Sequence, residues 1–280
     1  MRSDNCKSRR AADGTNEHMM IETEAGRVNR RRQRLLFDSV ADLYDASRPL
    51  YTDDAVDYLV RTAGLDSASA VLEVGCGTGQ LTRQLAGRGL TLAAIDIGPS
   101  MIAAARRGIR SDSVTFQATS FEDLAAEDGS FDAIVAADAF HWIDPELRFS
   151  KSARLLSPSG WLAVLSLQHI YDEPLQTALR KMWVARSDDG GSWLRRPTTA
   201  EIIGESGYFG AAAEASYSAR LRVPASSAVD LENTRATALS WPEDERRAFT
   251  EELRGHLATE SVGLTQVATV TTAQVARRAV

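Results

Sequence analysis

Residues 71–80 constrain the fold of this chain more than any other stretch, because they combine an apolar run with a glycine-rich turn. They read Val-Leu-Glu-Val-Gly-Cys-Gly-Thr-Gly-Gln, with glycines at three alternate positions. The apolar, β-branched half is typical of a buried strand. The glycines let the backbone turn sharply and let a ligand approach without a Cβ atom in the way. A helix over about residues 80–86 would direct its free N–H groups at that ligand, so the stretch predicts a nucleotide-like cofactor site.

The spacing of the glycines excludes two common phosphate-binding motifs. A dinucleotide fingerprint needs Gly or Ala at the sixth position from Gly75, where this chain has Gln80, and the P-loop pattern is absent. The string resembles motif I of the class I S-adenosylmethionine-dependent methyltransferases, Glu/Asp-x-Gly-x-Gly-x-Gly, at Glu73, Gly75, Gly77 and Gly79. The resemblance implies an α/β, Rossmann-like class I methyltransferase fold. That fold has a seven-stranded, mostly parallel sheet with helices on both faces, and here we expect a helical cap as well.

The order of elements in the middle of the chain agrees with such a fold. Strands are expected at about residues 70–74, 90–97, 114–118, 131–137 and 161–167, and helices at about 80–88, 99–108 and 145–156, with a short helix or turn at 121–126. Strand and helix therefore alternate, which predicts a mainly parallel sheet. The strands read as nearly continuous apolar runs, as strands covered on both faces do.

The rest of the chain divides around this core. Residues 1–28 are polar and poor in aromatic residues, so we expect a disordered basic leader there. Residues 29–280 are expected to form one domain, with cap helices in 29–64, a cofactor-binding core at 70–170 and a variable substrate region at 171–280. In the variable region, helices are expected at about 173–187, 198–206, 226–239 and 243–258, and strands at about 215–223 and 264–275 that pair as a terminal antiparallel hairpin.

Composition and charge exclude several classes of partner. Residues 1–34 carry nine Lys/Arg and five Asp/Glu, whereas the remainder has 23 basic and 33 acidic side chains, a balance of −10. An acidic body argues against a nucleic-acid track across the domain. The basic run at 30–34 fits a solvated leader or a helix start, with RNA or an acidic membrane surface as the alternative.

The sequence shows no targeting signal and no functional pattern of cysteines. No run approaches the ~18 apolar residues of a membrane span, and the N-terminus lacks the apolar region of a secretory signal. The two cysteines, Cys6 and Cys76, have neither disulfide nor metal-ligand spacing. We therefore expect a cytoplasmic protein, monomeric or homodimeric, with no bound metal, membrane or nucleic acid.

An acidic residue at the end of the second strand is the first test of the cofactor hypothesis. Asp96 stands 21 residues beyond Gly75, where a carboxylate can accept hydrogen bonds from both ribose hydroxyls. The alternative is an Asp that only starts a turn or caps the helix that Pro99 opens. In the cofactor interpretation Ile97 lies against the adenine with Met101 in the same pocket, although core packing explains both residues equally well.

The segment after the third strand departs from the family pattern. Many family members have an Asp followed by a small residue there, and these contact the adenine amino group and ring. The aligned pair in this chain is Ser120 and Phe121. A serine hydroxyl can still bond to the base, though more weakly than a charged acceptor. Glu122 and Asp123 are alternative acceptors if the register shifts by a residue or two.

Two further segments resemble a small-molecule subgroup, the trans-aconitate-type methyltransferases. Residues 137–145 read Ala-Asp-Ala-Phe-His-Trp-Ile-Asp-Pro, where the subgroup has His-Trp or Gln-Trp after the fourth strand, and residues 37–51 resemble its N-terminal leader. The resemblance implies that Asp138 joins the cofactor-binding residues. It also implies that Glu73 accepts from the methionine ammonium, directly or through water, and that the loop residues Gly75, Cys76, Gly77 and Gly79 surround that end without a catalytic role for the cysteine.

The candidate catalytic residue is His141. Methyl transfer from a sulfonium is an in-line displacement, so the protein mainly has to hold the acceptor close and in line. A base helps if the acceptor is a neutral hydroxyl, and the ordinary pKa of a histidine, about 6.5, suits that task. Contact with substrate or cofactor, or packing against Trp142, are equally open roles for His141. His169, just past the fifth strand, is a weaker second candidate.

The resemblance and the acidic body together predict an S-adenosylmethionine-dependent methyltransferase that acts on a small organic molecule, with oxygen as the first choice of acceptor atom. No Asn/Asp-Pro-Pro-Tyr/Phe motif follows the fourth strand, which disfavours a base in DNA. Two other classes stay open. One is an enzyme of the same fold that catalyses cyclisation or decarboxylation, and the other is a non-catalytic cofactor-binding subunit.

Overall fold

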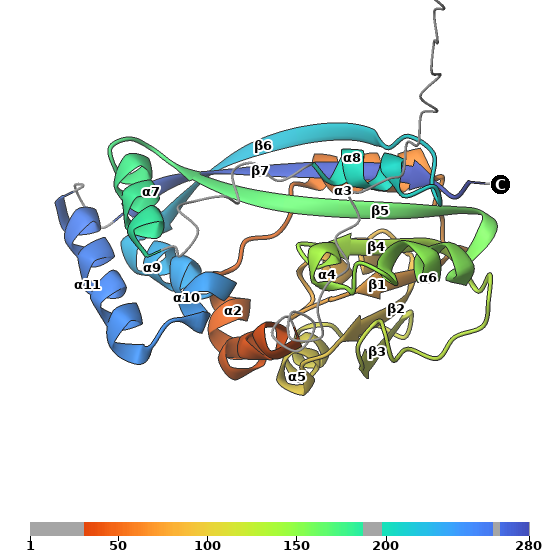
Figure 1. Cartoon of the computed structure of the whole chain (residues 1–280), viewed down its shortest axis with the longest axis horizontal. Helices are drawn as coiled ribbons and strands as arrows, with labels where there is room; N and C mark the ends of the chain where they lie inside the picture. Colours follow the sequence, from red (N-terminus) through yellow and green to blue (C-terminus); the bar gives the residue numbers. More distant parts are fainter. Residues whose placement is uncertain (1–30, 187–197, 260–263, 280) are drawn as a thin grey trace, which may run out of the picture.

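The computed structural model describes residues 31–186, 198–259 and 264–279. Within these residues a seven-stranded sheet has the order β3-β2-β1-β4-β5-β7-β6 (Figure 1). Its strands are β1 (Ala70–Val74), β2 (Thr91–Asp96), β3 (Val114–Ala118), β4 (Phe131–Ala137), β5 (Leu156–Tyr171), β6 (Ala213–Pro224) and β7 (Leu264–Arg277). Strands β1 to β5 pair in parallel, and β7 runs antiparallel to both β5 and β6. The predicted mostly parallel α/β sheet with an antiparallel pair at its edge is confirmed.

Helices cover both faces of the sheet. They are η1 (Phe37–Val40), α2 (Ala41–Ser47), α3 (Asp53–Ala63), α4 (Gln80–Ala86), α5 (Pro99–Gly108), η2 (Phe140–Trp142), α6 (Arg148–Leu155), α7 (Leu175–Ala185), α8 (Thr199–Glu205), α9 (Ala225–Asn233), α10 (Ala236–Ser240) and α11 (Glu243–Thr259). Successive residues of β1 enter different cores, as the period of a strand requires. Leu72 packs in a core with Phe149 and Ile203, and Val71 packs in another with Leu59 and Leu85.

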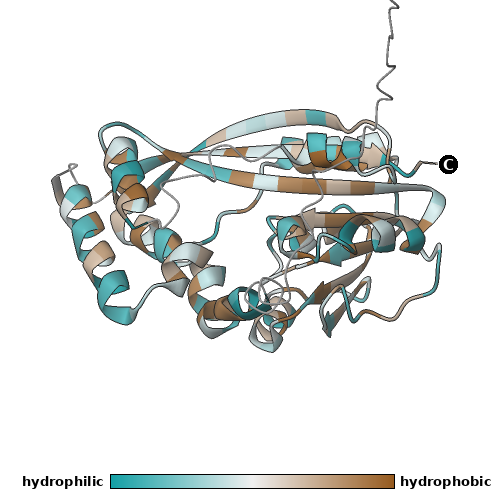
Figure 2. Cartoon of the chain, in the orientation of Figure 1, coloured by the Kyte–Doolittle hydropathy of each residue, from teal (hydrophilic) through white to brown (hydrophobic). Residues whose placement is uncertain are grey.

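A third core lies where β5 and β7 extend beyond the central strands. There the helices α7, α9 and α11 gather at one end of the molecule (Figure 1). Tyr171 and Val267 from the strands pack with Leu179, Val229 and Phe249 from the helices. Figure 2 shows α11 as mostly hydrophilic, which fits a helix that buries a single apolar stripe and exposes the rest.

The observed elements differ from the expected ones where long-range contacts override local sequence. The single helix expected at about 226–239 is two helices, because the chain turns extended at Arg235. The helix expected from about 145 begins at Arg148, after a turn in which Leu147 N–H donates to Asp144 O. The turn expected at 157–160 lies inside β5, where pairing with β4 shifts register between Phe131 and Ala133. The leader expected at 1–28 lies outside the described residues.

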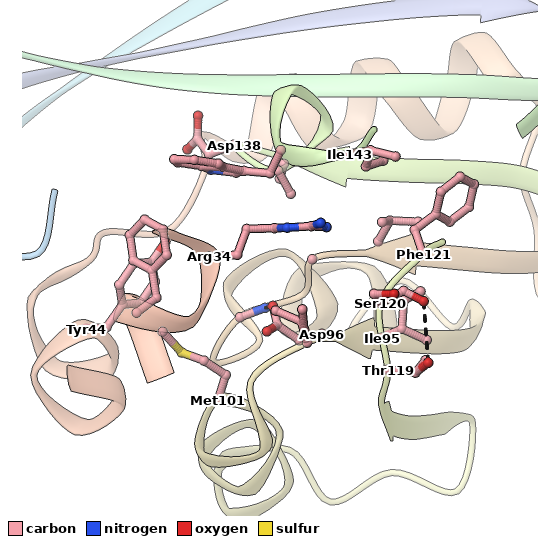
Figure 3. Close-up of a pocket in the computed structure, with 18 residues that line it drawn as sticks. Arg34, Tyr44, Ile95, Asp96, Met101, Thr119, Ser120, Phe121, Asp138 and Ile143 are labelled. Carbon is pink, nitrogen blue, oxygen red and sulfur yellow. Dashed lines mark hydrogen bonds between the residues drawn. The ribbon is translucent and has the colours of Figure 1, made fainter. Parts of the chain in front are cut away.

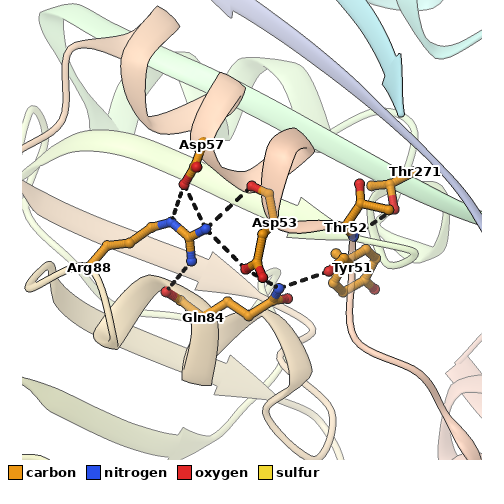
Figure 4. Close-up of polar contacts among 7 residues, drawn as sticks. All are labelled: Tyr51, Thr52, Asp53, Asp57, Gln84, Arg88 and Thr271. Carbon is orange, nitrogen blue, oxygen red and sulfur yellow. Dashed lines mark hydrogen bonds and ion pairs between the residues drawn. The ribbon is translucent and has the colours of Figure 1, made fainter. Parts of the chain in front are cut away.

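A polar cluster fixes α3 against α4 (Figure 4). The guanidinium of Arg88, just after α4, donates to Asp57 Oδ1 at 2.7 Å, to Asp53 Oδ1 at 3.1 Å and to Gln84 O at 2.9 Å. The Gln84 side chain in turn donates to Tyr51 O at 2.8 Å. The bond from Gln84 to Tyr51 O also fixes the segment before α3. Tyr51, in that segment, reaches the candidate site described below.

Arg88→Gln should lower the free energy of unfolding by about 1–2 kcal/mol, because three charge-assisted bonds are lost at a partly exposed position. Arg61→Gln is a matched control, because Arg61 is exposed on α3, and it should change stability by less than about 0.5 kcal/mol. Urea unfolding of the two variants measures this difference. Equal stabilities would show that the cluster does not hold the two helices together.

Candidate active site

A cavity in the described residues lies at the carboxyl ends of the parallel strands. It holds about 690 Å³ of empty space, part of it open to solvent. It is lined by Arg34, Phe37, Tyr44, Val74, Gly75, Gly77, Ile95, Asp96, Ile97, Met101, Thr119, Ser120, Phe121, Ala137, Asp138, Ala139, Trp142 and Ile143. Most predicted cofactor residues are therefore brought together at one cavity, although Glu73, Cys76 and Gly79 do not line it.

The glycine loop forms one wall of the cavity. Gly77 has a φ of 56°, a conformation that glycine adopts without strain. A Cβ added to Gly77 would meet nothing closer than Tyr44 Cε1 at 3.8 Å, so the backbone there faces open space. Gly75 and Gly79 serve packing instead. A Cβ would lie 2.4 Å from Ala139 Cβ at Gly75 and 2.6 Å from Ile109 Cδ1 at Gly79.

The carboxylate of Asp96 joins two loops at the edge of the cavity. Asp96 Oδ2 accepts from Gly77 N–H at 2.9 Å, and Oδ1 accepts from Gly98 N–H at 2.8 Å. Burial raises the pKa of Asp96, and the two backbone N–H groups offset part of that rise. Because each oxygen uses one lone pair on the backbone, its other lone pair stays available to a ligand hydroxyl.

Residues that follow β2 and β3 also line the cavity. Ile97 and the buried Met101 lie on the β2 side. Ser120 and Phe121 lie on the β3 side, and both are buried. The Ser120 hydroxyl donates to Asp123 Oδ2 at 2.8 Å, so it can offer a ligand only an acceptor lone pair.

Residues before α3 cover the cavity. Phe37 makes edge contacts with Tyr44 and with Trp142, at centroid distances of 5.9 and 6.0 Å. The side chain of Arg34 crosses the cavity between the levels of Asp138 and Asp96 (Figure 3), and its Nη1 donates to Glu122 Oε2 at 3.1 Å. Arg34 and Phe37 were not predicted as lining residues, because nothing local in the sequence says which cap side chains reach the sheet. Trp142 and Ile143, which follow β4 on and after η2, were also not predicted as lining residues.

A single aspartate fastens this cover to the core. Asp38 Oδ1 accepts from the backbone N–H groups of Ser100 at 2.7 Å and Met101 at 3.2 Å, and Oδ2 accepts from the Ser100 hydroxyl at 3.1 Å. These N–H groups belong to the first turn of α5, which otherwise has no side-chain cap. Asp38 therefore caps α5 from a distant segment and holds η1 over the cavity.

Asp138 lies at the far side of the cavity in a strained conformation, with a φ of 51°. Its Oδ1 accepts from Leu167 N–H at 3.0 Å and its Oδ2 from the Tyr51 hydroxyl at 3.2 Å. Burial raises the pKa of Asp138, and the Leu167 N–H and the nearby Arg48 offset part of the rise. The strain is maintained by contacts from β5 and from the segment before α3, as is typical of functional sites.

Two predicted residues lie beneath the loop instead of in the cavity. Glu73 is 1% exposed, and its Oε2 has no hydrogen-bond partner among the described residues. Burial raises the pKa of Glu73 to about 8, and the nearby Thr82 offsets only part of the rise. Cys76 packs with Ala94 and Ile102, and burial raises the pKa of its thiol well above the ordinary range. A buried, protonated thiol is a poor nucleophile.

The candidate base lies outside the lining. His141 is exposed on η2, and its ring lies 4.9 Å from the ring of Trp142, which does line the cavity. The second candidate, His169, is 8% exposed on β5. Within the described ranges there is no cluster of His, Cys, Asp and Glu that could hold a metal ion. None of the helices described is long and apolar enough to span a membrane.

Comparisons with known proteins agree with this geometry. Residues 72–164 match the family model described as "Methyltransferase domain". The chain is 34% identical over 179 residues to an uncharacterized methyltransferase of Mycobacterium tuberculosis, and the match covers 64% of this chain and 63% of that protein. It is 40% identical over 125 residues to a ubiquinone biosynthesis O-methyltransferase of Xanthomonas oryzae, covering 43% of this chain and 52% of that protein. The matches thus span about half to two thirds of these relatives.

Solved structures show the same fold. A putative type II methyltransferase from Anaeromyxobacter dehalogenans superposes with a TM-score of 0.57 at 22% identity, covering 82% of this chain and 97% of that chain. A putative methyltransferase from an antibiotic biosynthesis pathway of Anabaena variabilis gives a TM-score of 0.51 at 16% identity, with 78% and 95% covered. The sheet and its surrounding helices thus form the Rossmann-like methyltransferase fold.

Asp96→Asn should weaken binding of S-adenosylhomocysteine by about 1–3 kcal/mol, because a charged acceptor is lost while the size of the side chain is kept. Asp112→Asn makes the same chemical change at an exposed position outside the cavity, and should leave affinity unchanged. Isothermal titration calorimetry measures both. Wild-type affinity in Asp96→Asn would remove this carboxylate from the ligand site.

Glu73→Gln should change the pH dependence of stability. Between pH 4.5 and about 8 the unfolded chain ionises this carboxyl while the folded protein keeps it protonated. The folded state therefore binds more protons, and this group lowers stability as pH rises through that window. The free energy of unfolding of Glu73→Gln minus that of wild type should increase from about pH 5 to about pH 8, by roughly 2 kcal/mol or more. A constant difference in chemical denaturation would show that Glu73 is ionised in the folded protein.

Proposed function

We propose that this chain is an S-adenosylmethionine-dependent methyltransferase that methylates a small organic molecule at oxygen. The observation that carries the proposal is the Asp96 carboxylate, held at the cavity edge by Gly77 N–H and Gly98 N–H. It leaves acceptor lone pairs at the place where the ribose of a nucleoside would lie. The match of residues 72–164 to the methyltransferase domain supports the same conclusion.

The residues present suit this cofactor. The backbone at Gly77 faces open space, which a ligand can approach closely. Ile97, Met101 and Phe121 provide apolar surface for a base, and Ser120 provides an acceptor lone pair beside it. Glu73 Oε2, buried and without a partner among the described residues, offers an unused acceptor under the loop for the methionine ammonium. S-adenosylmethionine itself would supply a methyl group already activated on a sulfonium.

The protein's contribution to catalysis is then mainly positioning. Phe37, Tyr44 and Trp142 line the cavity and contact one another through Phe37, and their apolar rings would limit the access of water to a bound ligand. Asp138 presents its carboxylate at the far side, fixed by Leu167 and Tyr51. We propose His141 as the base for a neutral hydroxyl acceptor, since it adjoins Trp142 at the cavity. A base of this kind contributes about 10²–10⁴-fold.

A small-molecule acceptor is favoured over a macromolecule by charge. Outside residues 1–34 the chain has ten more acidic than basic side chains, 33 against 23, which repels nucleic acid. Oxygen as acceptor atom is supported by the O-methyltransferase among the partial matches. We also propose a cytoplasmic location and a monomer or homodimer.

The test is transfer of a labelled methyl group from S-adenosylmethionine to a metabolite extract of the source cells. Wild-type protein should label a small-molecule fraction. Gly77→Val should abolish the transfer together with cofactor binding, because a β-branched residue cannot adopt the positive φ without distorting the loop. His141→Ala should lower turnover by about 10²-fold or more while cofactor affinity stays unchanged.

Other outcomes would replace the proposal. Label in protein or RNA would overturn the substrate class. Tight cofactor binding with no transfer to any fraction would favour the non-catalytic subunit, and cofactor-dependent loss of a metabolite without label would favour cyclisation or decarboxylation. Unchanged turnover in His141→Ala would assign His141 to packing.

A further inference from the structure

A group of polar side chains lies outside the lining of the cavity, behind Tyr44 and Asp138. It comes from three distant parts of the chain: Arg48 at the end of α2, His169 on β5, and Glu232 and Arg235 around the junction of α9 and α10. The Arg48 guanidinium contacts the ring of Tyr44, which lines the cavity, and the charges of Arg48 and Arg235 offset part of the rise in the pKa of Asp138. The mechanism described above uses none of these four residues.

The charge of Arg48 is not matched by a carboxylate. Its Nε donates to Thr234 Oγ1 at 3.1 Å and its Nη2 donates to Thr234 O at 2.9 Å, both neutral oxygens. Its guanidinium also lies 4.8 Å from the centroid of the Tyr44 ring. In the part of the chain that the structure describes, no Asp or Glu oxygen lies within 4.0 Å of it.

The carboxylates of Glu232 and Asp138 are hydrogen-bonded to other groups. Glu232 Oε2 accepts from Arg235 Nε at 2.6 Å, and Glu232 Oε1 accepts from Arg235 Nη2 at 3.1 Å and from the Tyr171 hydroxyl at 3.0 Å. Asp138 accepts from Leu167 N–H and the Tyr51 hydroxyl. With Glu232 bonded to Arg235, Arg48 is the guanidinium of this group that has no carboxylate partner within 4.0 Å among the described residues.

The same group of side chains contains a buried nitrogen that has no hydrogen-bond partner among the described residues. His169 is 8% exposed, and its Nε2 is buried with no hydrogen-bond partner among the residues that the structure describes. Burial and the charges of Arg235 and Arg48 lower the pKa of His169 to about 3, so the ring is neutral at physiological pH. A buried polar atom without a partner costs about 1–3 kcal/mol, and a ligand group that bonded to Nε2 would remove this cost.

We propose that the methyl acceptor is a small organic acid whose carboxylate is anchored by Arg48, with His169 Nε2 as a further contact, and that the methyl group goes to a hydroxyl elsewhere in the same molecule. This proposal rests on the proposed function. A planar guanidinium binds a carboxylate through two parallel bonds. The single unmatched charge fits a carboxylate better than a phosphate, which carries about −1.5 to −2.

The anchored carboxylate is not the methylated group. Bonding to the Arg48 guanidinium occupies its lone pairs and neutralises its charge, which makes it a poor nucleophile. The acceptor hydroxyl oxygen instead forms a bond to the methyl carbon as the carbon–sulfur bond breaks. The hydroxyl proton leaves to a base or to solvent, and S-adenosylhomocysteine remains. The anchor sets the distance from the acid to the reacting hydroxyl, and so determines specificity.

The experiment uses the full chain, S-adenosylmethionine with a labelled methyl group, and a metabolite extract of the source cells. The labelled product is applied to an anion exchanger at neutral pH and identified by mass spectrometry. We expect a retained product that keeps a free carboxylate and carries an ether methyl group. A neutral product, a phosphate ester or a methyl ester of the only acid group would overturn the proposal.

Variants test the anchor itself. At subsaturating acceptor, Arg48→Gln should lose about ten- to a hundredfold in the rate of label transfer, since a hydrogen bond to a charged group contributes about that factor. Arg48→Lys should recover part of the loss, because it keeps the charge but not the planar fork. Arg220→Gln removes the same charge from an exposed position on β6 and should transfer label at the wild-type rate. Wild-type transfer by Arg48→Gln would overturn the anchor.

Calorimetry with S-adenosylhomocysteine separates this proposal from the one on which it rests. Arg48→Gln should bind S-adenosylhomocysteine within about twofold of wild type, because the anchor serves the acceptor. Loss of that affinity would place Arg48 in the cofactor site and overturn its role as anchor. Failure of the wild-type protein to transfer label to any fraction would contradict the proposed function, and the acceptor anchor with it. If Arg48→Gln does not fold, the charge of the wild-type product and the Arg48→Lys rate still decide the proposal.

Discussion

The hydrogen bonds of the Asp96 carboxylate to Gly77 N–H and Gly98 N–H hold the candidate site together. They tie the turn after β1 to the turn after β2, two loops that parallel pairing brings to one sheet edge. They also fix a half-buried carboxylate, whose pKa burial raises, in the lining of the cavity. The glycine at position 77 is required for this arrangement, because its positive φ points the N–H at Asp96.

The cap depends on this core through a second aspartate. Asp38 caps the first turn of α5, which starts directly after the Asp96 turn, and so holds η1 above the cavity. From there α2 leads to Arg48, whose bonds to Thr234 connect the cap to the α9–α10 junction. The cofactor side and the proposed acceptor side are thus parts of one continuous set of contacts. A substitution in the cap can therefore affect both the proposed cofactor site and the proposed acceptor site.

The sequence was informative where local signals decide structure. The apolar runs and the flanking Gly and Pro residues placed β1, β3, β4 and α5 at their observed bounds, and the glycine spacing indicated Asp96 as the acid at the loop. Contacts between distant residues were not visible. The break between α9 and α10 coincides with bonds to Arg48, 186 residues away, and Arg34 reaches the cavity only because its helix folds over the sheet. Neither the break between α9 and α10 nor the position of Arg34 at the cavity has a local sequence signature.

The most direct test of the central claim is a crystal structure of the protein with S-adenosylhomocysteine. The account predicts the ribose hydroxyls at the Asp96 carboxylate, the base against Ile97 and Phe121, and the amino-acid end beside the backbone of Gly77. Density for the ligand anywhere else, or a ribose that does not contact Asp96, would contradict the assignment of this cavity to a nucleoside cofactor.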